Sequence, residues 1–302
     1  MKKIVSFINF QKIMAQPYDK LQKVFKTGKG QPDIPKLSDP ELDFSVFKVN
    51  DFPVLYVKHK KPVQGVCIYV AGGGMLKYPK KAQAKEMVRY AGELGRDMVL
   101  PYYPLCPKHN LYDVYDMLYE LYKKLLTEFR AENIAFLGGS SGGNHTVGLI
   151  SHINAKGENL PMPGKVYVSS PGTMLCSDAE IKMAEKLDRT DLVMSRKALE
   201  TIFNGMTAGR EVPEYMKYLQ KGDYTGLKEI YLCFGGDELF AAAAPSLKKR
   251  LEECGVKVTL EIGEGMYHCY SVMPFVSEAR QGYNNMINYL KNNISEEGVK
   301  TI

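Results

Sequence analysis

From residue 64 onward the chain repeats one order of elements: a short apolar run, a glycine-rich turn and then a helical pattern. Each apolar run has the length of a strand and ends at glycine, proline or polar residues. Buried apolar strands that alternate with helices favour a mostly parallel sheet covered by helices on both faces. We therefore predict an α/β fold. The predicted strands cover residues 65–71, 98–103, 133–137, 165–169, 229–234 and 256–262.

Two parts of the chain depart from this alternation. Residues 1–28 place apolar side chains at helical spacing, and a linker rich in Gly, Pro, Asp and Lys follows them up to residue 40. Residues 175–225 contain helix-like segments and no convincing buried strand. Between these parts we expect two paired strands, 44–49 and 54–58, joined by a turn at residues 51–53. A length of 302 residues suits one α/β domain over the whole chain.

Charge and cysteine usage narrow the classes of partner. The net charge is +6, but the lysine pairs are spread along the chain, so we predict no nucleic-acid partner. No apolar run approaches the ~18 residues of a membrane span. The six cysteines lack C-x-x-C spacing, and the N-terminal apolar stretch lacks an export cleavage site. We expect free thiols, a cytoplasmic location and neither metal nor organic cofactor; a homodimer is left open.

Residues 138–142, Gly-Gly-Ser-Ser-Gly, match the G-x-S-x-G pattern of a sharp strand-to-helix turn that carries a nucleophilic serine. The flanking positions favour glycine because a Cβ atom there would meet neighbouring backbone. The next register, residues 139–143, fits as well, so Ser140 and Ser141 are both candidates. A phosphate-binding loop is the alternative, but neither a Walker loop nor G-x-G-x-x-G is present at this turn, which argues against a nucleotide-dependent enzyme.

A second glycine run, Ala-Gly-Gly-Gly at residues 71–74, closes the first of the predicted buried strands. Acyl transfer needs backbone N–H donors directed at the tetrahedral oxyanion, and consecutive glycines let the backbone approach a substrate closely. We expect the oxyanion donors to be the N–H groups of Gly73, Gly74 and Ser141, the last being the residue after a nucleophile at Ser140.

A serine nucleophile also needs a general base and a carboxylate that orients it. In folds with this turn, the acid and then the histidine follow at the ends of later strands. His268 follows the last predicted strand, whereas His145 and His152 lie on the helix directly after the turn. Asp237 is our preferred acid and Glu238 its rival, because Asp237 comes first off its strand. We interpret three other acids as surface or cap charges: Asp178, Glu180 and Asp223.

With these landmarks in order, residues 64–293 resemble the hormone-sensitive lipase-like family of α/β-hydrolases. Aligning the family's G-D-S-A-G-G-N without gaps makes Ser140 the nucleophile. The family's Gly-x-x-Asp-x-Leu resembles the region around Asp237. The other matching segments are 71–74 for H-G-G-G, 102–109 for a tyrosine-rich segment with proline, and 268–270 for His-Gly-Phe.

The resemblance implies a helical cap over the site, formed by about residues 1–40 and the insertion 175–225. Three departures bear on activity. Ala71 replaces the usual histidine, which helps to fasten the oxyanion loop. Gly139 replaces an acidic residue, and the glycines before Asp237 are shifted. These changes predict a slower enzyme or a different substrate range.

We therefore predict a serine carboxylesterase, lipase-like in family, that hydrolyses small or medium acyl esters through an acyl-enzyme. Its expected catalytic residues are Ser140, Asp237 and His268. An amidase, peptidase or thioesterase with the same residues is an alternative, as is a non-catalytic hydrolase-like ligand binder. The expected partner is a small-molecule acyl ester.

Overall fold

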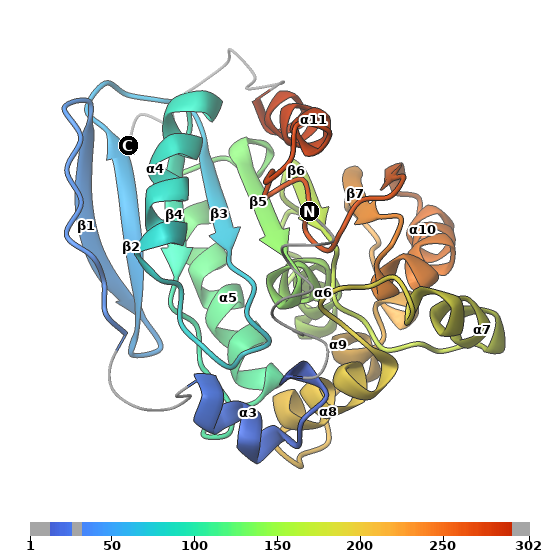
Figure 1. The fold of residues 1–302 in the computed structure, drawn as a ribbon. Coiled ribbons are helices and arrows are strands. Elements are labelled where there is room, and N and C mark those ends of the chain that lie inside the picture. The colour runs from blue at the N-terminus through green and yellow to red at the C-terminus, as the bar shows by residue number, and fades with distance from the viewer. Residues whose placement is uncertain (1–12, 26–31, 292–302) are drawn as a thin grey trace.

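The computed structural model describes residues 13–25 and 32–291 (Figure 1). The predicted helix over residues 1–28 and the N-terminal part of the predicted cap fall partly outside the described residues. Within the described residues, one 8-stranded sheet has the order β1-β2-β4-β3-β5-β6-β7-β8. The neighbouring pairs from β4 to β8 are parallel, and only the β1–β2 and β2–β4 pairs of this sheet are antiparallel. The predicted α/β fold with a mostly parallel sheet is confirmed.

The strands are β1 (Leu42–Val49), β2 (Phe52–His59), β3 (Val66–Val70), β4 (Asp97–Pro101), β5 (Ile134–Gly139), β6 (Lys165–Ser169), β7 (Glu229–Gly235) and β8 (Lys257–Gly263). The α-helices of the described residues are α3 (Tyr18–Phe25), α4 (Lys81–Leu94), α5 (Leu111–Leu126), α6 (Ser141–Lys156), α7 (Asp178–Leu187), α8 (Arg196–Thr207), α9 (Glu214–Lys217), α10 (Ala244–Glu253) and α11 (Ala279–Lys291). Short 3-10 helices span Ala131–Asn133, Leu219–Lys221 and Leu239–Ala243.

Helices cover both faces of the sheet, as the alternation of elements predicts. All five residues of β3 are buried. Val66 and Val70 belong to one apolar cluster with α5 and α6, whereas Cys67 and Tyr69 belong to a second cluster with α4 and α11. Successive side chains of a strand point to opposite faces, so each strand contributes to two cores. Figure 1 shows α4 and α5 on opposite sides of the strands.

The hairpin before β3 differs from its prediction by two residues. Asn50 and Asp51 form the turn with φ angles of 46° and 66°, and β2 begins directly after them. Asn and Asp tolerate such angles better than other side chains, which suits them to a two-residue hairpin turn. Pro53, expected in the turn, lies in β2 opposite Lys48.

The segment between β6 and β7 supplies α7, α8 and α9, and residues 175–225 contain no strand. Helix α3, far away in sequence, lies beside α8 (Figure 1). The contact is tight, because a Cβ atom on Gly205 would lie 1.9 Å from the ring of Tyr18. In Figure 1 these helices lie near the ends to which the arrows of β3 and β5 point. Across the described ranges, no helix is both long enough and apolar enough to cross a membrane.

Candidate active site

Ser140 occupies the turn between β5 and α6. Its φ and ψ angles are 54° and −124°, and its N–H donates to the carbonyl of Ser169 at the end of β6 over 3.0 Å. A non-glycine residue keeps such an angle only where its surroundings hold it firmly. The backbone of Gly72 packs directly against this turn. A Cβ atom at this position would lie only 2.7 Å from the carbonyl oxygen of Gly139. The first glycine run therefore touches the serine turn directly.

Gly142 explains why the helix can start so close to the sheet. A Cβ atom at this position would lie 1.9 Å from the carbonyl oxygen of Val70 in β3. Only glycine permits this approach, which brings the first turn of α6 against the carboxyl end of β3. Ser140, at the N-terminus of a 16-residue helix, thus lies where the helix dipole stabilises negative charge.

His268 follows β8 and lies against a buried carboxylate. Its Nδ1 atom is 2.6 Å from Oε2 of Glu238, whose side chain is fully buried. Burial opposes protonation of the ring, but the Cys269 thiol and the Glu238 carboxylate favour it. The balance raises the pKa of His268 well above its ordinary value of 6.5. The contact fixes which ring nitrogen faces the acid and leaves Nε2 for other partners.

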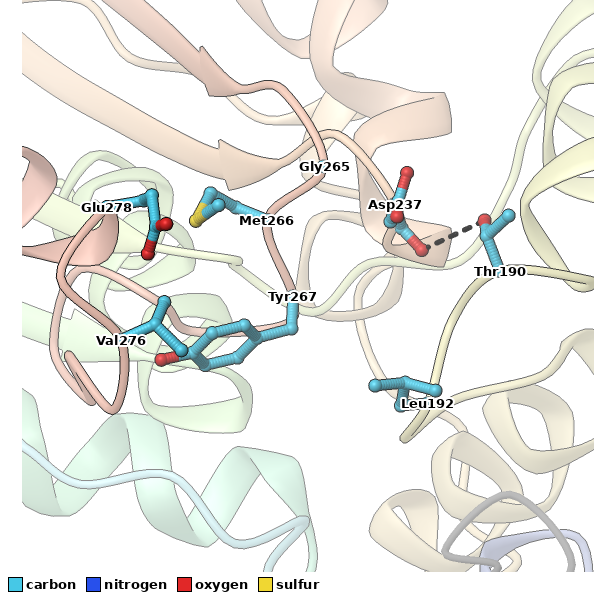
Figure 2. A pocket seen from close by; sticks show the side chains of 8 residues that line it. All are labelled: Thr190, Leu192, Asp237, Gly265, Met266, Tyr267, Val276 and Glu278. Atoms are coloured by element: carbon cyan, nitrogen blue, oxygen red, sulfur yellow. Dashed lines mark hydrogen bonds between the residues drawn. The ribbon is translucent and has the colours of Figure 1, made fainter. Parts of the chain in front are cut away.

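The carboxylate that contacts His268 belongs to Glu238. The prediction that Asp237 makes this contact is therefore wrong. After β7 the chain turns back at the two glycines, and Oε1 of Glu238 accepts the N–H of Gly235 over 2.8 Å. The Glu238 carboxylate thereby contacts both the N–H of Gly235 and the imidazole of His268. Asp237 instead faces a small neighbouring cavity of about 230 Å³, where the Thr190 hydroxyl donates to its carbonyl oxygen over 3.1 Å (Figure 2).

Two serines that the sequence did not single out hold the histidine loop. Cys269, next to His268, has a φ angle of 59°, and its N–H donates to the Ser170 hydroxyl over 2.7 Å. The hydroxyls of Ser271 and Ser169 are 2.8 Å apart. Ser169 is the last residue of β6 and Ser170 follows it, so the end of this strand contacts both the serine turn and the histidine loop.

The insertion, residues 175–225, also forms hydrogen bonds with the segment that carries Glu238. Asp191 accepts the N–H of Leu239 over 2.6 Å and, through its other oxygen, the N–H of Met194 over 2.9 Å. Together with the Thr190 bond to Asp237, the insertion therefore holds both chain neighbours of Glu238. Sequence spacing carries no signal for this contact, because residues 190–191 and 237–239 meet only in the folded chain.

The predicted oxyanion loop follows β3. Gly73 and Gly74 have φ angles of 142° and 62°, which explains the need for glycine at these two positions. The N–H of Gly74 donates to the Ser141 hydroxyl over 2.8 Å. Gly74 was expected to donate to substrate, but in this structure its N–H is engaged by a side chain. Ser141 itself is buried, with 6% of its surface exposed.

Ser140 and His268 line one cavity of about 510 Å³. Ser141, Gly73 and Gly74 line it as well, so the structure brings together every predicted site residue except Asp237. Its apolar wall comes mainly from the insertion and the 3-10 helix after Glu238: Leu192, Val193, Met194, Leu199, Ile202, Phe203, Met206 and Phe240. Its polar lining includes Lys77, Gln83 and Glu86.

Other residues weighed from the sequence lie elsewhere. His145 is fully buried between the rings of Tyr103 and Tyr115, and burial lowers its pKa to about 3. His152 contacts Asp116. Glu180 is no surface charge, since it is only 3% exposed. Among the described residues, no three His, Cys, Asp or Glu side chains are arranged to hold a metal ion.

The sheet, the serine turn and the histidine–carboxylate pair define the α/β-hydrolase class. Residues 67–272 match the family model described as "alpha/beta hydrolase fold", which covers more than half of the chain. The chain belongs to this family. No curated protein matches it in sequence.

Similar solved structures have the same fold. A putative esterase from Staphylococcus aureus is 19% identical with a TM-score of 0.75, covering 93% of this chain and 92% of that one. An esterase from the bacterial hormone-sensitive lipase family is 19% identical with a TM-score of 0.74, covering 92% and 98%. EstE5 soaked with p-nitrophenyl butyrate is 19% identical with a TM-score of 0.72, covering 91% and 97%.

Proposed function

We propose that the protein is a serine carboxylesterase that hydrolyses small or medium acyl esters. One observation carries the proposal. Ser140 and His268 line the same cavity, and Oε2 of the buried Glu238 lies 2.6 Å from Nδ1 of His268. A serine, a base and an orienting carboxylate in this order form the catalytic unit of acyl transfer.

In the proposed reaction, Nε2 of His268 takes the proton of the Ser140 hydroxyl as Oγ attacks the ester carbonyl. The tetrahedral intermediate collapses, the alcohol leaves with the proton from His268, and an acyl-serine remains. Water then attacks the acyl carbon as His268 takes its proton. The second tetrahedral intermediate collapses, His268 returns the proton to Oγ of Ser140, and the acid leaves. Glu238 holds the imidazole tautomer and stabilises the imidazolium that forms twice in each cycle.

For the oxyanion we propose the N–H groups of Gly73 and Ser141. Both residues line the cavity beside Ser140. Ser141 begins α6, so its N–H is one of the first amides of the helix and adds the favourable end of the helix dipole. Gly74 has an indirect role in this scheme, because its N–H is bonded to the Ser141 side chain.

We propose that α3, with residues near it, and the insertion 175–225 form the cap and bind the acyl chain. Met14, next to α3, and Met206 of α8 both line the cavity. Methionine side chains adapt their shape, which suits chains of differing length. A cavity of about 510 Å³ lies within the usual range for small-molecule sites. The p-nitrophenyl butyrate soaked into EstE5 is a matching test substrate.

The proposal is tested with p-nitrophenyl esters of increasing acyl length, using wild type and Ser140→Ala. We expect turnover of the shorter esters by wild type and loss of at least about 1000-fold in kcat for Ser140→Ala. Equal rates for the two proteins would overturn the assignment of Ser140.

A matched series of p-nitroanilides with the same acyl groups separates esters from amides. We expect turnover of the esters to exceed that of the anilides. Preference for the anilides would make the protein an amidase. Binding of esters without any turnover would make it a ligand binder.

A further inference from the structure

The oxyanion loop has an unusual backbone that something must hold in place. Gly73, Gly74 and Met75 follow one another with φ angles of 142°, 62° and 54°. Methionine is strained at such an angle, and residues of this kind persist only where neighbours fix them. Ala71, at the start of the loop, has no polar side chain that could do so.

Two hydroxyl groups connect the ends of this loop to the body. At the far end, the N–H of Gly74 donates to Oγ of Ser141 over 2.8 Å. At the near end, the hydroxyl of Tyr103 donates to the carbonyl oxygen of Ala71 over 2.7 Å. Burial raises the pKa of Tyr103, and the nearby Ser141 side chain offsets part of this rise.

We propose that Ser141 and Tyr103 are positioning residues that together set the shape of the oxyanion loop: the Ser141 hydroxyl holds the N–H of Gly74, and the Tyr103 hydroxyl holds the carbonyl oxygen of Ala71. The inference rests on the proposed function and adds two side chains to it. Neither hydroxyl touches the reacting atoms. Each holds one end of the loop, so that the N–H of Gly73 points at the oxyanion.

The surroundings of these two hydroxyl groups are buried. Tyr103 is 1% exposed, and its ring packs edge-on against the buried His145 at a centroid distance of 5.1 Å. His145 stays neutral because burial lowers its pKa to about 3. Hydrogen bonds in a buried, uncharged setting are stronger than in water, which suits them to fixing backbone geometry.

The test compares Ser141→Ala, Tyr103→Phe and the double variant. Each single variant should lower kcat on p-nitrophenyl butyrate on the order of tenfold while KM changes by less than about twofold, because only the transition state uses the oxyanion donors. A boronic acid that mimics the tetrahedral state should lose affinity by the same factor. Since both hydroxyls hold the same loop, losing either one releases it, and the double variant should be no slower than the slower single variant.

Tyr102→Phe is the matched control, because its buried hydroxyl has no hydrogen-bond partner within the described part of the chain. It should leave kcat unchanged. Titration of active serines with a fluorophosphonate corrects every rate for misfolded protein. Unchanged or raised kcat in Ser141→Ala, or fully multiplicative losses in the double variant, would overturn the inference. An inactive wild type would refute the proposed function instead.

Discussion

The path of the chain after β7 decides which of two adjacent carboxylates, Asp237 or Glu238, reaches His268. The chain leaves β7 and folds back, so that Glu238 lies under the imidazole while Asp237 points into a separate cavity. The sequence signalled this only as glycines shifted from the usual spacing. The position of Ser140 at the β5–α6 turn and of His268 after β8 was predictable, because the motif and the chain order indicate both. The acid and the engagement of Gly74 depend on how a loop turns, which no local pattern specifies.

Exchanging each acid for its amide tests the assignment. Glu238→Gln should lower kcat by at least about 100-fold, because the amide neither stabilises the imidazolium nor fixes the tautomer. Asp237→Asn, one residue earlier, should stay within about threefold of wild type. Steady-state kinetics on p-nitrophenyl butyrate decides, and the reverse ranking would restore Asp237 as the acid.

The pH profile follows from the raised pKa of His268. The imidazole must be neutral to accept the serine proton, so kcat/KM should fall as the pH drops through this pKa, with a midpoint above 6.5. Glu238→Gln removes the carboxylate that favours the charged ring and should move the midpoint to lower pH. A wild-type midpoint at or below 6.5 would contradict the account.

Among the elements, the junction of β3 with α6 leaves least room for change. Gly142→Ala would place a Cβ atom 1.9 Å from the carbonyl oxygen of Val70 and should cost about 3 kcal/mol of unfolding free energy. Gly92→Ala in α4 is the control: nothing lies within 4 Å of its Cβ position, and the change should stabilise the protein by about 1 kcal/mol. Urea denaturation measures both, and equal effects would refute this packing.

Element types were predictable, and their ends were less so. The helical pattern near the end of the sequence predicts a last helix from Pro274, but α11 begins at Ala279. The residues before it form a loop against Tyr267, whose hydroxyl accepts the N–H of Phe275 over 2.9 Å. The side-chain hydrogen bond to Tyr267 sets where the loop before α11 lies, and positive φ angles set the turn at Asn50 and Asp51. Apolar periodicity reports neither.

For the whole molecule, the alternation of strands and helices predicted the parallel sheet and its two covering layers. It did not predict the strand order or the antiparallel pairing of β2 with β4. Nor did the alternation predict the contact between α3 and α8. This contact depends on Gly205 packing against the ring of Tyr18, which is far away in sequence. Tertiary packing supplies these features.

A substitution at the end of the sheet far from Ser140 should change stability without changing activity. Arg96 is fully buried just before β4, at the end of the sheet opposite Ser140. It donates to the carbonyl oxygens of Leu290 over 3.0 Å and of Asn133 over 2.8 Å, joining α11 to the sheet. Arg96→Lys should lower the unfolding free energy by about 2 kcal/mol, because it leaves buried carbonyls unpaired. Its kcat at 25 °C should match wild type; a changed kcat would contradict this separation.

The most direct test is to locate the covalent adduct of a fluorophosphonate by peptide mass spectrometry. The account predicts one adduct on the peptide spanning the β5–α6 turn, carried by Ser140, lost in Ser140→Ala and retained in Ser141→Ala. An adduct on Ser141, or wild-type protein that hydrolyses esters yet carries no adduct at this turn, would contradict it.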